Sequence, residues 1–239
     1  MSFFETSQKV LRQLKNQTDE VLLFYSAGGK DGIVLLDMLA KANIKTTCVF
    51  MYLVKNMKHT QIYIDYAEKK YGIKTIQYPH FILSRYLKVG QLCVEDVDIP
   101  VIELKDIEAQ ARKDTGIDFI VSGRKIDDGF AIGQKLRYSK PYGFVKRKCY
   151  PLLEWKNRHC LNYIKKERLI NPMNYGRGDF GKHNTKYASD AFTIDLNILR
   201  YLEKNYPEDL ILIEQKFPFA LEKLHEFNFT QNETASKSK

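Results

Sequence analysis

The segment Ser26-Ala27-Gly28-Gly29-Lys30-Asp31-Gly32 places glycines, a lysine and an aspartate between two apolar runs. Glycine adopts backbone conformations closed to other residues and lets an anion approach the main chain. The free N–H groups at the start of a helix attract phosphate, and Lys30 would add a positive charge. The segment is therefore a candidate phosphate-binding loop. The alternative is a tight turn in which Asp31 only stabilises the N-terminal end of the following helix.

Two common phosphate-binding motifs do not fit this segment. A Walker A loop has the pattern G-x-x-x-x-G-K-[ST], but Gly29-Lys30 is followed by Asp31, and no glycine stands at the required earlier position. The dinucleotide-binding pattern G-x-G-x-x-G is absent as well. The segment alone leaves both interpretations open.

A second group of chemically useful residues follows the apolar run Asp118–Ser122. Arg124 stands just after this run, where its guanidinium group could bind a phosphate or sulfate through two parallel hydrogen bonds. Asp127 and Asp128 could orient Arg124 or bind a metal ion. A surface salt bridge is the alternative interpretation of these three residues.

A basic segment follows, because no acidic residue occurs between Gly129 and Tyr150. Its cations are Lys135, Arg137, Lys140, Lys146, Arg147 and Lys148. Aromatic residues are interleaved with them, a combination that suits stacking on bases, so residues 135–148 could fold over a nucleotide or bind nucleic acid. A solvated loop is the alternative. The candidates for contacting substrate are Lys146, Arg147, Lys148 and, in a later glycine-rich stretch, Arg177.

The composition sets the broad class. The chain has 239 residues, is 44% hydrophobic and carries a formal net charge of +9, which favours anionic partners. No apolar run is long enough to span a membrane, and the first residues do not resemble a secretory signal. The four cysteines are scattered without a C-x-x-C pair, which predicts free thiols in a reducing cytoplasm and no zinc site.

Strands and helices alternate along the first half of the chain. The predicted strands are 21–26, 46–53, 74–78 and 118–122, and the predicted helices between them are 31–41, 60–71 and 107–114. Helices are also expected at 1–18, 155–168, 195–205 and 219–227. The alternation predicts an α/β fold with a doubly wound, mostly parallel, Rossmann-like sheet. In such a sheet, ligands bind beyond the carboxyl ends of the strands.

Three blocks of sequence, in order, resemble one family. Residues 27–32 (AGGKDG) are similar to the S-G-G-x-D-S loop of the PP-loop ATP pyrophosphatase superfamily, and residues 122–129 (SGRKIDDG) resemble the G-x-R-x-x-D segment of its phosphoadenosine-phosphosulfate (PAPS) reductase branch. The third block, YPLLEW at 150–155 with YI at 163–164 and NPMNYG at 171–176, resembles P-L-x-x-W…Y-I…N-P-x-Y-x-x-G. Three short segments, at 71–73, 78–80 and 217–220, are similar to reductase-like proteins of bacteriophages.

The resemblance implies an adenine nucleotide, ATP or a relative, with Mg²⁺. It assigns cofactor binding to the loop, the end of the second strand and the residue before Arg124, namely Ser26, Ala27, Gly28, Gly29, Gly32, Met51, Leu53 and Gly123. It implies catalytic roles for Lys30, Asp31 and Arg124, a metal at Asp31, and substrate contacts from Asp127 and Asp128. Cleavage would fall between the α- and β-phosphates, with adenylation of an acceptor and release of pyrophosphate.

The departures from the family narrow the chemistry. Ala27 and Gly32 stand where serines are expected, although Ser26 is one place away from the first. No cysteine follows Cys160, so the thiol nucleophile of the true reductases is missing, and the lack of paired cysteines predicts no iron–sulfur cluster. We expect a reductase-like ATP pyrophosphatase acting on an unknown acceptor. The alternative is a non-catalytic nucleotide- or nucleic-acid-binding module on the same fold.

The expected organisation has three parts. Residues 1–185 would form the nucleotide-binding domain, 186–228 a helical C-terminal extension and 229–239 a disordered tail. The expected location is cytoplasmic, in a host cell if the gene belongs to a phage. A homo-oligomer is compatible with the sequence.

Overall fold

The computed structural model describes residues 3–128, 144–145, 147–173, 194 and 196–237. Within them a six-stranded sheet has the order β3-β2-β1-β4-β6-β5. Its strands are β1 (Glu20–Tyr25), β2 (Lys45–Tyr52), β3 (Lys74–Pro79), β4 (Ile120–Ser122), β5 (Phe144–Val145) and β6 (Lys148–Cys149). All neighbouring pairs are parallel except the antiparallel pair β5 and β6. The predicted doubly wound, mostly parallel α/β fold is confirmed.

The central strand β1 is apolar from Val21 to Phe24 because both of its faces are covered. Val21 and Leu23 belong to the cluster beneath α2, whereas Leu22 belongs to the cluster that includes Ala111 of α5. All three β1 side chains are fully buried. Consecutive strand residues point to opposite faces, so this continuous apolar run requires helices on both sides of the sheet.

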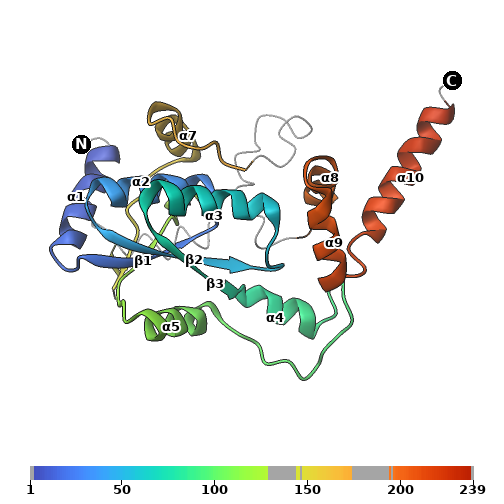
Figure 1. Cartoon of the computed structure of the whole chain (residues 1–239), viewed down its shortest axis with the longest axis horizontal. Helices are drawn as coiled ribbons and strands as arrows, with labels where there is room; N and C mark the ends of the chain where they lie inside the picture. Colours follow the sequence, from blue (N-terminus) through green and yellow to red (C-terminus); the bar gives the residue numbers. More distant parts are fainter. Residues whose placement is uncertain (1–2, 129–143, 146, 174–193, 195, 238–239) are drawn as a thin grey trace.

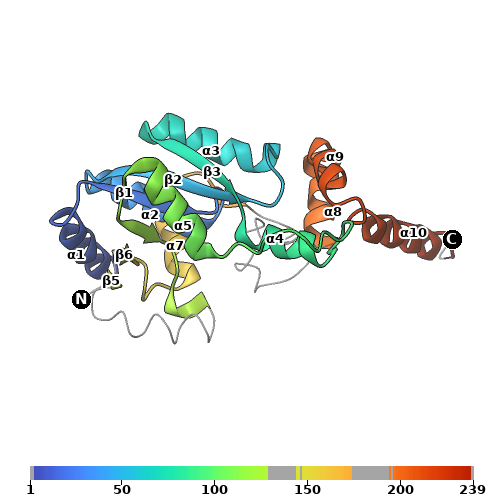
Figure 2. The same ribbon diagram turned by 90° about the horizontal axis from the view of Figure 1, so that it is seen from below.

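The helices form the two covering layers. Figure 1 shows α2 (Lys30–Lys41), α3 (Lys58–Tyr71) and α7 (Asn157–Lys166) over one face and α5 (Leu104–Thr115) over the other. The view from the second face shows α5 in front of the strands (Figure 2). Helix α1 (Phe3–Lys15) joins the first layer through the cluster that contains its Leu11 and Leu14.

Helices α3 and α5 both end at a glycine. Gly72 follows α3 with φ 62°, and Gly116 follows α5 with φ 72°. This left-handed conformation lets the glycine N–H bond back to the last turn, here to the carbonyl oxygens of Glu68 and Arg112. Both helices therefore end where the chain must turn toward the next strand.

Three further helices, α8 (Leu196–Asn205), α9 (Pro207–Lys216) and α10 (Glu222–Lys237), follow the sheet domain. Helices α8 and α9 pack beside the ends of α3 and α4 (Phe81–Lys88), and α10 extends away from the rest of the molecule in both views (Figures 1 and 2). Leu199, Leu202 and Phe217 are buried in one cluster with Leu53 and Leu83 of the sheet domain.

The sequence patterns missed α4 and α9. Helix α9 begins with Pro207 at its first turn, a common start signal, and α4 begins after His80, which accepts a hydrogen bond from the Ile82 N–H. Helix α10 continues to Lys237, so helix replaces most of the disordered tail expected at 229–239. The expected boundary at residue 185 lies outside the described residues. Among the residues that the structure describes, no helix has the length and apolarity needed to cross a membrane.

Candidate active site

A cavity of about 660 Å³ opens at the carboxyl ends of the parallel strands. It gathers residues from the ends of β1, β2, β3 and β4 and from the starts of α2 and α5. Ten predicted site residues line it: Ser26, Lys30, Asp31, Gly32, Met51, Gly123, Arg124, Asp127, Asp128 and Lys148. The structure thus brings the two predicted loops into one site.

The strand order explains this meeting. Strand β1 pairs with β2 on one side and β4 on the other, so the connections that leave β1 and β4 diverge at a topological switch point. A crevice outside the carboxyl ends of the strands forms at such a point. The loops that follow β1 and β4 contribute Ser26, Gly123 and Arg124 to the lining of the crevice.

The loop after β1 leads directly into α2. Ala27 has φ 41°, a left-handed conformation that L-residues rarely adopt, and the Gly29 N–H donates to the Ser26 carbonyl at 2.9 Å. Gly29 caps α2 without a side-chain hydrogen bond. The first amides of a helix lack intrahelical acceptors, and Lys30, Asp31 and Gly32 line the cavity. This helix start can hold an anion.

A compact charge cluster stands beside this helix start. Oδ2 of Asp31 lies 2.8 Å from Lys125 Nζ and 3.1 Å from Lys30 Nζ, and Oδ1 accepts from the Cys160 thiol at 3.1 Å. Lys125 Nζ also lies 2.9 Å from Asp128 Oδ1. The cluster ties α2, α7 and the loop after β4 together.

The cluster fixes the charge states of its members. Burial alone would raise the pKa of Asp31, but the ammonium groups of Lys125 and Lys30 outweigh it and hold that pKa below its usual value. Burial would lower the pKa of Lys125, but the carboxylates of Asp31 and Asp128 raise it. Burial raises the pKa of the Cys160 thiol. Asp31 and Lys125 are therefore ionised and the thiol is protonated at neutral pH.

Lys125 was not predicted, although it lies within the SGRKIDDG segment. Its side chain is fully buried, with a relative exposure of 0%. A lysine is rarely buried unless it is paired, and its partners here are Asp31 in the first turn of α2 and Asp128 in its own segment after β4. The spacing to Asp128, three residues later, was the only signal in the sequence.

Two glycines are dictated by close packing. A Cβ atom on Gly123 would lie 2.8 Å from the Asp31 Cβ, so only glycine lets the loop after β4 approach Asp31 this closely. A Cβ atom on Gly32 would lie 2.9 Å from the Tyr25 Cβ. The glycine at position 32, where the family has serine, thus allows a close contact between α2 and β1.

The other end of the cavity is apolar. Its walls include Phe24, Met51, Phe81, Ile82 and Leu104. His80 also lines this end, and its Nδ1 accepts from the Ile82 N–H at 3.1 Å, which places the ring proton on Nε2. Burial lowers the pKa of His80 to about 4, so the ring is neutral at pH 7.

Several predicted residues lie elsewhere. Arg147 is exposed and forms an ion pair with Asp118. Leu53 lines a separate small cavity next to the C-terminal helices. Ala27, Gly28 and Gly29 do not line the large cavity, and a Cβ atom on Gly28 would lie 2.3 Å from the Met173 side chain. Lys146 and Arg177 lie outside the described residues.

Two lining cations differ in their pairing. Lys148 forms an ion pair with Glu108, and both side chains line the cavity. Among the described residues, Arg124 forms no ion pair, and its side chain is exposed. Arg124 is therefore the lining cation best placed to receive an external anion.

The expected Mg²⁺ ligand does not fit this geometry. Both oxygens of Asp31 are engaged by lysines or a thiol. Within the described part of the chain, no group of three or more His, Cys, Asp or Glu side chains is arranged to hold a metal ion. Each carboxylate oxygen of Asp31 therefore already has a partner.

Comparison with known proteins gave one family match. The sequence model of the phosphoadenosine phosphosulfate reductase domain matches residues 21–178. No curated protein matches significantly. Among solved structures, the chain is similar to the U34-tRNA thiolase NcsA from Methanococcus maripaludis with its [4Fe-4S] cluster, with 17% identity, a TM-score of 0.47, and coverage of 91% of this chain and 78% of that chain.

One expectation is corrected by this comparison. The sequence predicted no iron–sulfur cluster because the cysteines are unpaired, yet the matched thiolase structure contains one. We therefore withdraw that prediction. In the structure described here, Cys48, Cys93, Cys149 and Cys160 are free and buried.

Proposed function

The chain belongs to the phosphoadenosine phosphosulfate reductase domain family, and from this premise we propose that its cavity binds ATP or a related adenine nucleotide. The base would lie at the apolar end near Met51, and the phosphates would lie at the start of α2 and against Arg124. We further propose that the protein cleaves ATP between the α- and β-phosphates.

The observation that carries the proposal is the composition of the large cavity at the switch point. It joins a helix start without a side-chain cap, an exposed arginine without an ion pair among the described residues, and an apolar end. Its volume of about 660 Å³ lies within the range of small-molecule sites. A nucleotide has the same division into an aromatic base and an anionic chain of phosphates.

The proposed reaction is adenylation of an acceptor. An acceptor oxyanion attacks the α-phosphorus, and a new oxygen–phosphorus bond forms. The bond from the α-phosphorus to the oxygen that bridges the β-phosphate breaks, and pyrophosphate leaves with the electron pair. The amides of α2 and the guanidinium group of Arg124 would stabilise the charge that develops on the phosphate oxygens.

Binding and chemistry are tested separately. Calorimetric titration with ATP, AMP, phosphoadenosine phosphate and phosphoadenosine phosphosulfate measures binding, and an Arg147→Met variant is a matched control because Arg147 is paired outside the cavity. ATP labelled in the α-phosphate, incubated with a panel of oxyanion acceptors, reports AMP or an adenylate. Absence of any nucleotide binding would refute the whole proposal. Binding of ATP without either product would refute only the adenylation step.

The nucleic-acid alternative has no support from the described residues. Arg147 and Lys148, the described cations of the basic segment, are paired with Asp118 and Glu108. The rest of that segment's cations lie outside the described residues. The alternative therefore remains a hypothesis from the sequence.

A further inference from the structure

All four carboxylate oxygens of Asp31 and Asp128 already have partners. Asp31 contacts two ammonium groups through Oδ2 and the Cys160 thiol through Oδ1. Asp128 contacts the Lys125 ammonium group through Oδ1, and its Oδ2 accepts from the Lys125 backbone N–H at 2.7 Å. One residue, Lys125, thus touches both carboxylates.

The position of Lys125 is the one that a bridging cation would take. Its Nζ lies 2.8 Å from Asp31 and 2.9 Å from Asp128, and its side chain is fully buried. Lys30 adds a second ammonium group at Asp31. Two lysines bring the same formal charge as one divalent ion, and two carboxylates balance it.

We propose that the Lys125 ammonium group replaces a divalent cation between Asp31 and Asp128, so that these aspartates supply no metal ligand in the nucleotide cavity. Asp31 then acts as a positioning residue. It holds the loop after β4, and with it the neighbouring Arg124, against the start of α2. The proposal rests on the proposed function only in taking this cavity as the nucleotide site.

The absence of a Cβ atom at Gly123 supports this role. The loop after β4 approaches so closely that a Cβ atom there would lie 2.8 Å from the Asp31 Cβ. Lys125, two residues later, contacts the same aspartate through Nζ at 2.8 Å. Removing the ammonium group would leave two carboxylates facing a common centre, an arrangement that hard cations bind.

The first experiment measures Mn²⁺ binding by electron paramagnetic resonance without nucleotide. Wild-type protein should bind no Mn²⁺ at this position, whereas Lys125→Met should gain one site that a Lys125→Met/Asp31→Asn double variant loses. Lys148→Met is the matched control, because it removes a lysine of the same cavity that is paired with a single carboxylate. Wild-type binding that Asp31→Asn abolishes would overturn the proposal, and so would a folded Lys125→Met that gains no site.

A second experiment keeps the proposal testable if Lys125→Met does not fold. ATP affinity is measured with Mn²⁺ and with EDTA for wild type and Asp31→Asn, and the ratio of the two dissociation constants is compared. The ratio should be the same in both proteins, within about twofold, because Asp31 does not touch the metal. A ratio that falls about tenfold or more in Asp31→Asn, the size of effect that changes around a metal site produce, would overturn it. A failure of ATP to bind at all would count against the proposed function, while the Mn²⁺ titration would still decide this inference.

Discussion

Asp31 and Asp209 occupy the same local position but belong to different kinds of environment. Each stands in the first turn of a helix, α2 and α9 respectively, and each carboxylate has a lowered pKa. Asp209 is fully buried, accepts the backbone N–H groups of Lys58 and His59, and contacts the His59 ring at 2.7 Å. Asp31 is bound by lysines at the wall of a cavity.

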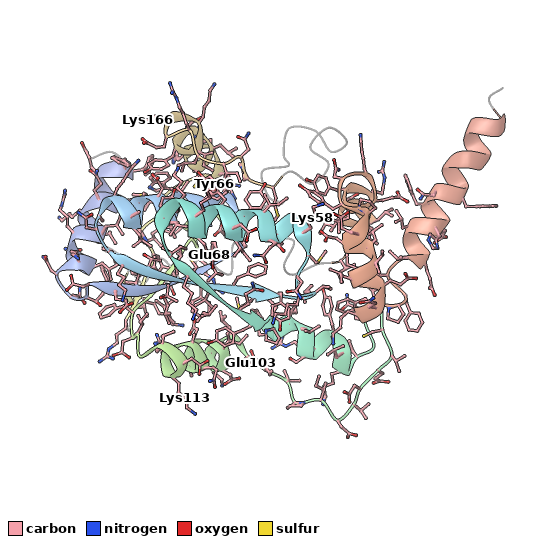
Figure 3. All side chains as sticks on the ribbon, in the orientation of Figure 1. Lys58, Tyr66, Glu68, Glu103, Lys113 and Lys166 are labelled. Atoms are coloured by element: carbon pink, nitrogen blue, oxygen red, sulfur yellow. The ribbon has the colours of Figure 1, made fainter. Side chains whose placement is uncertain are left out.

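The difference shows that a buried charge does not by itself mark a functional site. Asp209 of α9 caps the N-terminus of α3 and so links the C-terminal helices to the sheet domain. The labelled Lys58, at the start of α3, lies beside α9 (Figure 3). Asp31 joins two loops that border a large open volume. The open cavity and an Arg124 that forms no ion pair with the described residues, rather than the shifted pKa, distinguish the second environment.

The largest expected effect is on stability and comes from the contacts between Asp209 and α3. Asp209→Ala removes two caps of α3 and leaves His59 without its carboxylate, so we expect a loss of about 3–5 kcal/mol in the free energy of unfolding. Urea unfolding measures it. Glu208→Gln, which removes an exposed ion pair with Lys58, should change stability by less than about 1 kcal/mol. A loss of stability equal to that of the control would show that the contacts of Asp209 do not stabilise the fold.

The second prediction concerns the open site. Arg124→Met should weaken ATP binding about ten- to hundredfold, because a charge-assisted contact to phosphate is lost. Its free energy of unfolding should change by less than about 0.5 kcal/mol, since the side chain is exposed. Calorimetry and urea unfolding measure the two quantities. If ATP affinity is unchanged, Arg124 does not contact the nucleotide, and the cavity no longer differs from the Asp209 environment by a ligand-binding residue.

Acid titration compares the two histidines. His59 has a carboxylate beside its ring, whereas burial depresses the pKa of His80 from 6.5 to about 4. Between pH 4 and pH 6.5, His80 binds more protons in the unfolded state than in the folded state. The stability conferred by neutral His80 is therefore present above pH 6.5 and is lost as pH falls toward 4. At pH 5 the loss is about 2 kcal/mol.

His80→Asn tests this assignment. Asparagine is a good helix cap and can still accept from the Ile82 N–H, but it does not titrate. The unfolding free energy of the variant should therefore fall less than that of wild type between pH 7 and pH 5, measured in urea at both values. Parallel curves for the two proteins would place the pH dependence on another group.

The sequence predicted the sheet and the position of the site for clear physical reasons. The part of a strand that is buried on both faces is apolar, as at Val21–Phe24 of β1, and the switch-point rule then places Asp31 and Arg124 near each other. Lys125 escaped because a lysine between an arginine and an isoleucine is typical of a surface. Its burial depends on two carboxylates, one of them from Asp31 of α2, which is far away in the chain.

The remaining differences follow from contacts that no local pattern encodes. Leu53 extends the apolar run of β2, but its side chain packs with α8 and α9 rather than with the nucleotide cavity. The β5–β6 pair has only two residues in each strand, too few for a periodic signal. Arg147 pairs with Asp118, which lies beside it only because β4 and β6 are neighbours.

The smallest expected effect concerns the missing loop hydroxyl. Gly32→Ser restores the family's residue, but its Cβ atom would lie 2.9 Å from the Tyr25 Cβ, and both α2 and β1 are held by packing on their other sides. We expect a loss of about 1 kcal/mol in the free energy of unfolding, at the low end of overpacking effects, and no gain in ATP affinity. Urea unfolding and calorimetry provide the two measurements.

Ala27→Ser is the matched variant, because it adds the family's other loop hydroxyl to a residue that already has a Cβ atom. It should change stability less than Gly32→Ser does, since no new backbone-attached carbon enters the contact with Tyr25. A Gly32→Ser protein that is as stable as wild type and binds ATP more tightly would show that packing does not require the glycine. Position 32 would then have lost a hydroxyl group that contributes to ATP binding. The start of α2 would then tolerate the family's serine at this position despite its close contact with β1.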